Sequence, residues 1–372
     1  MVKPTSIIIP AQIIIGTMYG ITQKVLLLQE AQGFAGVRHK FDKPFTQCLL
    51  MVCAMMCSLF IRKYWDSNGK GPHPKTSFRT KVILAIPASF DLITTTLNIF
   101  GLIYINVSIY QMFRGAHIIF TSLFSILFLK KKITGHEWVG IVIIIVALIL
   151  IGWSGMYIPG IDGSLEQDTH TAGEKFLGAM LVIIAQVFHA TQVILEEYLI
   201  RFVGTVGALE VIGNEGFAGL LLLIFVMYPF AFICPGNDPS PLSGGSLENI
   251  IDTFTMAFNN GYIILMFFIY IVVAGSYNIS AMLCIAFTSS LNEAIVDVVR
   301  TLTIWICMLI SAAIGLPFGE PWVKYSWMEL GGFVLMIIGN FIYNGFIRFP
   351  CFKYTGHETN VCEDPISHEP LN

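Results

Sequence analysis

Two arginines lie inside apolar segments that are long enough to cross a membrane: Arg114 in YQMFRGAHIIFT and Arg300 in VDVVRTLTIWIC. A guanidinium group stays charged at any physiological pH, and burying it in hydrocarbon is costly. Such a residue persists only where it lines a polar cavity or meets a partner. The two arginines therefore predict a polar interior between helices, of the kind that transport proteins use.

The rest of the chain is strongly apolar: 55% of its 372 residues are hydrophobic and only 12% are charged, whereas soluble proteins carry about 25% charged residues. Apolar runs of about 20 residues can cross a bilayer as helices. We expect an all-α integral membrane protein with ten transmembrane helices. The predicted spans are 7–28, 45–64, 82–104, 108–129, 136–156, 176–200, 209–233, 262–284, 290–314 and 325–347.

The predicted spans divide into two sets of five around the polar stretch 157–175. In each set the fourth span carries the arginine, and a Trp and a Gly follow in the fifth: Trp138 and Gly140 in one set, Trp327 and Gly331 in the other. Because five is odd, the second set enters the membrane from the opposite side, which makes a 5+5 inverted repeat. The expected units are a first five-helix repeat at 1–172, a second, inverted five-helix repeat at 173–350, and a cytosolic tail at 351–372.

Lysine and arginine are unevenly distributed between the two sides of the predicted bundle. If the N-terminus is cytosolic, the cytosolic side carries 13 of the 21 Lys and Arg residues and the other side carries five. The three that remain, Lys24, Arg114 and Arg300, lie within spans. Because cytosolic loops are rich in Lys and Arg, both termini are predicted to be cytosolic.

Several spans carry polar residues at helical spacing, so that their side chains share one face. Glu293, Asp297 and Arg300 are one such stripe, and Tyr110 and Arg114 are another. We expect these stripes to converge on a shared aqueous interior. The candidate substrate contacts are Arg114, Arg300, Lys24, Tyr110, Gln111, Asn98 and Gln192. The candidates for charge pairing or proton coupling are Asp91, Glu196, Glu215, Glu293 and Asp297.

Some of these polar residues also have a purely structural interpretation. Asp297 and Arg300, three residues apart, can form an ion pair that only neutralises itself. Glu197 is expected to reach water near the end of its span. His117 and His189 are expected to be helix-packing histidines whose ring nitrogens are hydrogen-bonded. The Gly16-x-x-x-Gly20 motif is expected to let two helices approach closely.

Motifs of other protein classes are missing from the sequence. It has no P-loop, no H-E-x-x-H, no Gly-x-Ser-x-Gly and no C-x-x-C. We therefore predict a protein that is not an enzyme, with no catalytic residue, no metal site, no cofactor and no contact with nucleic acid.

Six short segments, in order along the chain, carry a resemblance to a known family: PASFD at 87–91, YQMFRG at 110–115, ILEE at 194–197, NEG at 214–216, DVVRT at 297–301 and YNG at 343–345. The chain resembles the drug/metabolite transporter superfamily, in its nucleotide-sugar-transporter-like branch, the solute carrier 35 family. The resemblance implies ten helices in two inverted repeats, with alternating access to a central cavity in an endomembrane, Golgi or lysosome. The GALNK signature of GDP-mannose carriers is absent, so that specificity is not implied.

Three functions fit these observations. A secondary carrier of a small polar metabolite, such as a nucleotide sugar, would use Arg114, Arg300 and Lys24 to clamp phosphate. A proton-coupled exporter of cationic solutes would account better for the surplus of carboxylates in the predicted interior. A receptor or scaffold that does not transport would need the charges only as structural pairs. The expected partners are a small-molecule substrate, a counter-substrate or proton, and the lipid bilayer; glycine-lined helices also allow a homodimer.

Overall fold

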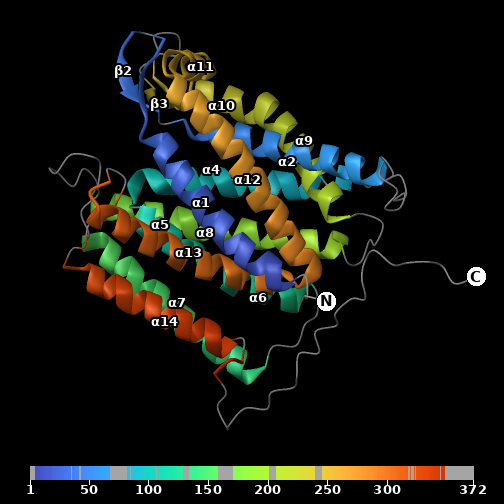
Figure 1. Ribbon diagram of the computed structural model, residues 1–372. Coiled ribbons are helices and arrows are strands. Elements are labelled where there is room, and N and C mark those ends of the chain that lie inside the picture. The colour runs from blue at the N-terminus through green and yellow to red at the C-terminus, as the bar shows by residue number, and fades with distance from the viewer. Residues whose placement is uncertain are drawn as a thin grey trace, which may run out of the picture.

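The structure is a computed structural model and describes residues 5–34, 36–41, 43–67, 82–83, 85–105, 107–128, 134–157, 171–200, 207–238, 245–316, 319, 322, 324–343 and 345–347. Most of these residues are helical, and the helices pack as one bundle (Figure 1). The named helices are α1 (Thr5–Leu27), α2 (Pro44–Ser67), α4 (Ala85–Tyr104), α5 (Val107–Arg114), α6 (His117–Leu127), α7 (Gly135–Tyr157), α8 (Ala172–Tyr198), α9 (Ala208–Leu222), the π-helical η2 (Leu223–Met227), α10 (Tyr228–Ile233), α11 (Ile250–Asn259), α12 (Gly261–Phe287), α13 (Ser290–Ala313) and α14 (Ser326–Tyr343). The strands are β1 (Glu30–Gln32), β2 (Arg38–Lys40) and β3 (Pro235–Asp238), of which β1 and β2 form an antiparallel hairpin.

Eight helical segments within the described residues are long and apolar enough to cross a membrane. They are Ser6–Leu27, Pro44–Tyr64, Gly135–Ser154, Ala172–Tyr198, Ala208–Ile233, Gly261–Phe287, Ile295–Ala313 and Ser326–Tyr343. The predicted all-α membrane fold is therefore confirmed, whereas the count of ten spans stays a prediction. The two predicted spans outside this set, 82–104 and 108–129, coincide with α4 and with α5 and α6 together. The predicted tail, 351–372, lies outside the described residues.

The predicted span 108–129 is not one continuous helix, because α5 ends at Arg114 and α6 begins after a short turn. At this turn the Gly115 N–H donates to the Met112 carbonyl at 2.9 Å, a spacing of three residues that is tighter than in an α-helix. A β-carbon on Gly115 would lie 2.8 Å from Met336 Sδ in α14, so a larger residue here would have to displace the Met336 side chain. The break places Arg114 at the C-terminal end of α5, where backbone carbonyls favour a cation.

The helices pack in pairs that join the two halves of the chain. α7 lies along α14 at one edge of the bundle (Figure 1), α4 packs on α8, and α2 packs on α9. α1 packs on α12 and α13, and α6 packs on α8 and α13. One apolar core forms between α1, α2, α9 and α12, and a second forms between α5, α6, α7, α8, α13 and α14.

The connections after α1 and after α10 meet at one end of the bundle, where β2, β3 and α11 gather (Figure 1). We call this part the cap: residues 30–34, 36–41 and 43 together with 235–238 and 245–259. The side chain of Lys43 is buried in the cap, and its Nζ lies 2.6 Å from Asp238 Oδ2 and 2.7 Å from Asp252 Oδ2. One ammonium group therefore joins the two connections.

A second carboxylate of the cap, Glu248, holds the start of α2. It accepts hydrogen bonds from the backbone N–H groups of Phe45 (2.7 Å) and Thr46 (2.9 Å) and from the Thr46 hydroxyl (2.6 Å). Burial raises the pKa of Glu248 to about 7, although these hydrogen bonds and Lys43 act in the opposite direction. Burial also acts to raise the pKa of Asp252, but the hydrogen bonds from Lys43 and Phe34 outweigh it and lower that pKa.

Candidate functional site

Two arginines from different parts of the chain share one carboxylate in the bundle interior. Arg300 forms an ion pair with Asp297, three residues earlier on α13. Arg114, at the end of α5, places Nη2 3.5 Å from Asp297 Oδ2. The side chains of Arg300 and Asp297 are 1% and 3% exposed. Two guanidinium groups and one carboxylate leave a net positive charge on this trio, Arg114, Asp297 and Arg300, which suits contact with an anionic group.

Tyrosines from α1 and α12 cover one side of the trio. The Tyr277 hydroxyl donates to Asp297 Oδ1 at 3.2 Å, and the Arg300 guanidinium carbon lies 4.9 Å from the centroid of the Tyr277 ring, a cation–π contact. The Tyr19 ring stacks on Tyr277 with centroids 5.2 Å apart and planes 9° apart. The Tyr19 and Tyr270 hydroxyls lie 3.1 Å from each other.

These three tyrosines were not among the residues predicted from the sequence. Tyr270 and Tyr277 are seven residues apart on α12, a spacing that puts both side chains on one face. That spacing was the available signal, but tyrosine is also common at membrane surfaces, where it has no role in a site.

Arg300 has donors left over after its ion pair. Within the described residues, its Nε and Nη1 atoms are buried and have no hydrogen-bond partner. The side-chain oxygen of Gln111, on α5, is likewise buried without a partner among those residues. Buried polar groups are normally satisfied in a folded protein. Unsatisfied donors and acceptors near the trio are therefore consistent with a site that a polar ligand completes.

Of three further predicted contacts, Tyr110 and Gln111 lie on α5 with Arg114, and Lys24 lies farther away. Tyr110 is buried on the same face of α5 as Arg114, and Gln111 lies near Gly20 of α1. Lys24 points instead toward Met308 of α13, with Nζ 4.0 Å from the sulfur. Met308 is about 12 Å along the helix axis from Arg300, at 1.5 Å per residue. The structure therefore does not place Lys24 in contact with the trio.

A second group of charged residues lies on α8 and α9. Gln192 Nε2 donates to Glu196 Oε1 at 2.8 Å, and the carboxyl group of Glu196 interacts with that of Glu215. Asp91 of α4 adds a further negative charge to this group through space. Because like charges in contact repel, a shared proton or a bound cation would relieve the repulsion. We call Glu196, Glu215 and Asp91 the acidic group.

Glu293 lies between the trio and the acidic group. It is buried, one turn before Asp297 on α13. It interacts electrostatically with Arg300 on one side and with Glu196 on the other. The predicted charge-pairing residues therefore interact with one another across α4, α8, α9 and α13.

The remaining polar candidates lie between helices and contact each other. Asn98 Oδ1 accepts a hydrogen bond from Gln186 Nε2 at 3.3 Å, between α4 and α8. The rings of His117 and His189 pack against each other with centroids 4.3 Å apart, which agrees with helix-packing histidines but not with satisfied ones. Both ring nitrogens of His117 are buried without a hydrogen-bond partner among the described residues.

The prediction that Glu197 reaches water is wrong. Its side chain is buried, and its carboxylate accepts hydrogen bonds from the Ser290 N–H at 3.0 Å and from the Ser290 hydroxyl. Because the first N–H groups of a helix have no partner within it, a carboxylate is stabilising there. Glu197 of α8 thus caps the start of α13.

Comparisons with known proteins agree with the resemblance read from the sequence. Residues 40–153 match the EamA-like transporter family. The chain is 29% identical to solute carrier family 35 member F6 of Rattus norvegicus over 86% of this chain and 82% of that protein. It is 28% identical to the human UDP-N-acetylglucosamine transporter over 27% of this chain and 30% of that protein.

A solved crystal structure has the same fold over 92% of this chain and 96% of its own, with a TM-score of 0.51 and 12% sequence identity. At that identity the likeness bears on the fold alone. The relatives are transporters and not enzymes, which fits the expectation that this chain is not an enzyme. The predicted resemblance to the drug/metabolite transporters and the solute carrier 35 family is therefore confirmed, and the chain is a multi-pass membrane protein with an EamA-like transporter segment.

Proposed function

We propose that this protein is a secondary carrier that moves a small polar organic solute across an endomembrane, Golgi or lysosome, by alternating access. The observation that carries the proposal is the trio, in which two buried arginines from α5 and α13 share the carboxylate of Asp297. A structural ion pair needs one cation for one anion. The trio has a second cation, whose charge Glu293, one turn earlier on α13, or an anionic group on a cargo can neutralise.

The packing of the helices supports two inverted repeats, 1–172 and 173–350. Suppose that α1, α2, α4, α5–α6 and α7 correspond in order to α8, α9, α12, α13 and α14. The main packing contacts between long helices then have counterparts. α1 packs on α12 as α8 packs on α4, and α1 packs on α13 as α8 packs on α6. α2 packs on α12 as α9 packs on α4, while α7 and α14 pack on each other. Such a pseudo-twofold arrangement supports transport by rocking of the two repeats.

The cargo class follows from the charge of the trio. Guanidinium groups bind phosphate in a bidentate manner, so a phosphate-bearing metabolite such as a nucleotide sugar fits Arg114 and Arg300. One relative carries a nucleotide sugar by its name, the human UDP-N-acetylglucosamine transporter, and supports this class. Neutral hydrogen bonds would come from Tyr110 and Gln111 on α5 and from Gln192 on α8. The stacked rings of Tyr19 and Tyr277 would offer a flat surface for a nucleotide base.

The test is uptake of labelled nucleotide sugars, nucleoside monophosphates and organic cations into proteoliposomes that contain the full-length protein. We expect nucleotide-sugar uptake that is accelerated when the vesicles contain a nucleoside monophosphate. Arg114→Gln and Arg300→Gln should each lower uptake at least tenfold. Arg38→Gln is the matched control, because the Arg38 side chain is 74% exposed in the cap and pairs only with Glu30 among the described residues. Normal uptake by a folded Arg114→Gln protein would exclude the trio as the binding group.

A second candidate is a proton-coupled exporter of cationic solutes. The observation that favours it is the contact between the Glu196 and Glu215 carboxyl groups, with Asp91 nearby. This function predicts cation movement that follows an imposed pH gradient and is lost in Glu215→Gln. The control, Glu30→Gln, changes an exposed side chain and should leave cation movement unchanged. If the protein is instead a scaffold, replacing Arg114, Asp297 and Arg300 together by apolar residues should leave its function intact.

A further inference from the structure

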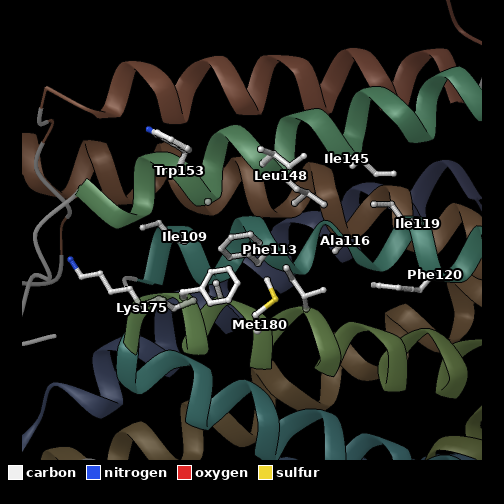
Figure 2. A pocket seen from close by; sticks show the side chains of 16 residues that line it. Ile109, Phe113, Ala116, Ile119, Phe120, Ile145, Leu148, Trp153, Lys175 and Met180 are labelled. Carbon is white, nitrogen blue, oxygen red and sulfur yellow. The ribbon is translucent and has the colours of Figure 1, made fainter. Parts of the chain in front are cut away.

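A cavity of about 370 Å³ lies between α5, α6, α7 and α8. Known small-molecule sites have volumes of about 300–1,000 Å³, so the cavity is large enough for a ligand. Its walls are apolar, as Figure 2 shows for Phe113, Ile119, Phe120, Leu148 and Met180. Among its described lining residues, Lys175 alone carries a charge. A polar metabolite would lose its hydration in this cavity with nothing to replace it, so the cavity fits a hydrocarbon chain.

The charged residue lies at one end of the cavity. Figure 2 shows Lys175 and Trp153 at this end and Ile119 and Phe120 at the other. Lys175 is in the first turn of α8 and Trp153 is near the end of α7. Lys and Trp at helix ends are typical of the boundary between hydrocarbon and headgroups. Here Lys175 is buried against the end of the cavity and Trp153 is about half exposed. The cavity therefore runs from the headgroup level into the depth of the hydrocarbon.

We propose that this cavity is a lipid site, which holds one acyl chain of an anionic phospholipid while the phosphate contacts Lys175. The apolar walls match the chain, and the ammonium group at the boundary end matches a headgroup phosphate in charge. A zwitterionic lipid would offer the same chain but a weaker attraction, since its own cationic group opposes Lys175.

The lipid site adjoins the trio through α5 and α6. Ile109, Phe113 and Ala116 line the cavity at positions i, i+4 and i+7, one face of the helical path. Arg114 lies between Phe113 and Ala116 and faces Asp297 instead. A chain in the cavity thus packs against the back of the break after α5.

Native mass spectrometry of the delipidated full-length protein tests the headgroup contact. The protein is mixed with equal amounts of phosphatidylglycerol and phosphatidylcholine that have the same acyl chains, and retained lipid is counted. We expect the protein to retain one phosphatidylglycerol molecule at least five times as often as one phosphatidylcholine molecule. Lys175→Gln should remove the preference, and Lys324→Gln, an exposed lysine in the connection before α14, should keep it. Equal retention of both lipids by the unmodified protein, or an unchanged preference in Lys175→Gln, would overturn the proposal.

A cavity-filling variant tests the acyl-chain part separately. Ala179 of α8 lines the cavity, and Ala179→Phe should lower retention of both lipids severalfold. Met180→Trp, at a half-buried position beside it, is a second variant in case the first fails to fold. Glycerol 3-phosphate, a headgroup without chains, should not displace the bound lipid at equal concentration. Wild-type retention in a folded cavity-filled variant, or displacement by glycerol 3-phosphate, would show that the cavity does not hold the chain.

Discussion

Gly16 of α1 and Arg300 of α13 lie in such close contact that a β-carbon at position 16 would clash with Arg300 Cδ. The same β-carbon would be 2.9 Å from the Tyr277 ring. The glycine motif of α1, expected to serve helix packing, therefore packs directly against the side chain that pairs with Asp297. The glycine face of α1 therefore limits where the Arg300 side chain can lie.

Gly16→Ala should displace Arg300 and destabilise the protein. An added methyl group in a tightly packed interior costs about 1–3 kcal/mol, and here it must move the Arg300 stem or the Tyr277 ring. The measurement is thermal unfolding of the full-length protein in detergent. Gly261→Ala, at the start of α12 where an added β-carbon meets nothing within 4 Å, is the control and should unfold at the wild-type temperature. If both variants unfold alike, the contact between Gly16 and Arg300 is looser than described.

Asp297→Asn should destabilise the protein more than Glu293→Gln does. Removing one partner of a buried ion pair costs about 3–5 kcal/mol, because the remaining charge stays buried without compensation. Asp297 is the shared partner of two arginines, whereas Glu293 Oε2 is buried with no hydrogen-bond partner among the described residues. Chemical unfolding in detergent gives both values. A larger loss for Glu293→Gln would mean that Glu293, and not Asp297, neutralises the arginines.

The cap should be more stable at mildly acidic pH than at alkaline pH. The pKa of Glu248 is about 7 in the folded protein and 4.5 for an ordinary glutamate, so the folded state binds this proton more tightly. The stability contributed by Glu248 is therefore complete below about pH 4.5 and is lost as the pH rises through about 7. Each unit of pKa shift is worth about 1.4 kcal/mol, so we expect a gain on the order of 1–3 kcal/mol from pH 8 to pH 5.5.

Hydrogen exchange of residues 30–41 and 245–259, corrected for the intrinsic pH dependence of exchange, measures this effect. Glu248→Gln removes the titrating group and should flatten the profile. Asp252 acts oppositely, because its pKa is lowered and its contribution is lost only below the ordinary value of 3.8. It therefore does not disturb the range from pH 5.5 to 8. A cap that opens faster at pH 5.5 would contradict the assignment to Glu248.

Lys43→Met should loosen the cap without unfolding the bundle. The substitution leaves Asp238 and Asp252 buried near each other with no ammonium group between them, at a cost of about 3–5 kcal/mol. Limited proteolysis should then cut the cap at least tenfold faster. Lys40→Met, on the exposed strand β2, is the matched control. Equal cleavage of the two variants would show that Lys43 does not hold the cap.

The positions of the spans were predictable from the sequence because apolar length alone determines them. The break in the span 108–129 was not predicted. It lies at Gly115, where α14 comes close enough that a β-carbon would meet Met336. Glu197 was wrongly expected to reach water, because its position near a helix end says nothing of the Ser290 backbone that meets it there. Both failures concern contacts between residues far apart in the chain.

The charged residues of the candidate site were predictable from the sequence, but the aromatic residues around them were not. Arg114, Asp297 and Arg300 were recognisable because charge is rare in hydrocarbon, and their helical spacing brought two of them to one face. Tyr19 and Tyr277 were missed because tyrosine is ordinary in a membrane protein. Lys24 was expected beside the arginines, but a shared helix face does not determine the height at which two helices meet, and it lies near Met308.

The bond between Glu197 and Ser290 ties the end of α8 to the beginning of α13. α8 is 27 residues long, about 40 Å at 1.5 Å per residue, and α13 carries both Asp297 and Arg300. A cargo that draws Arg300 toward itself therefore pulls on the whole length of α8, or it separates Glu197 from Ser290. In the proposed carrier, α8 and α13 therefore move together while the hydrogen bond between Glu197 and Ser290 holds, and α13 moves alone once it breaks. Ser290 lies about 10 Å along the helix axis from Asp297.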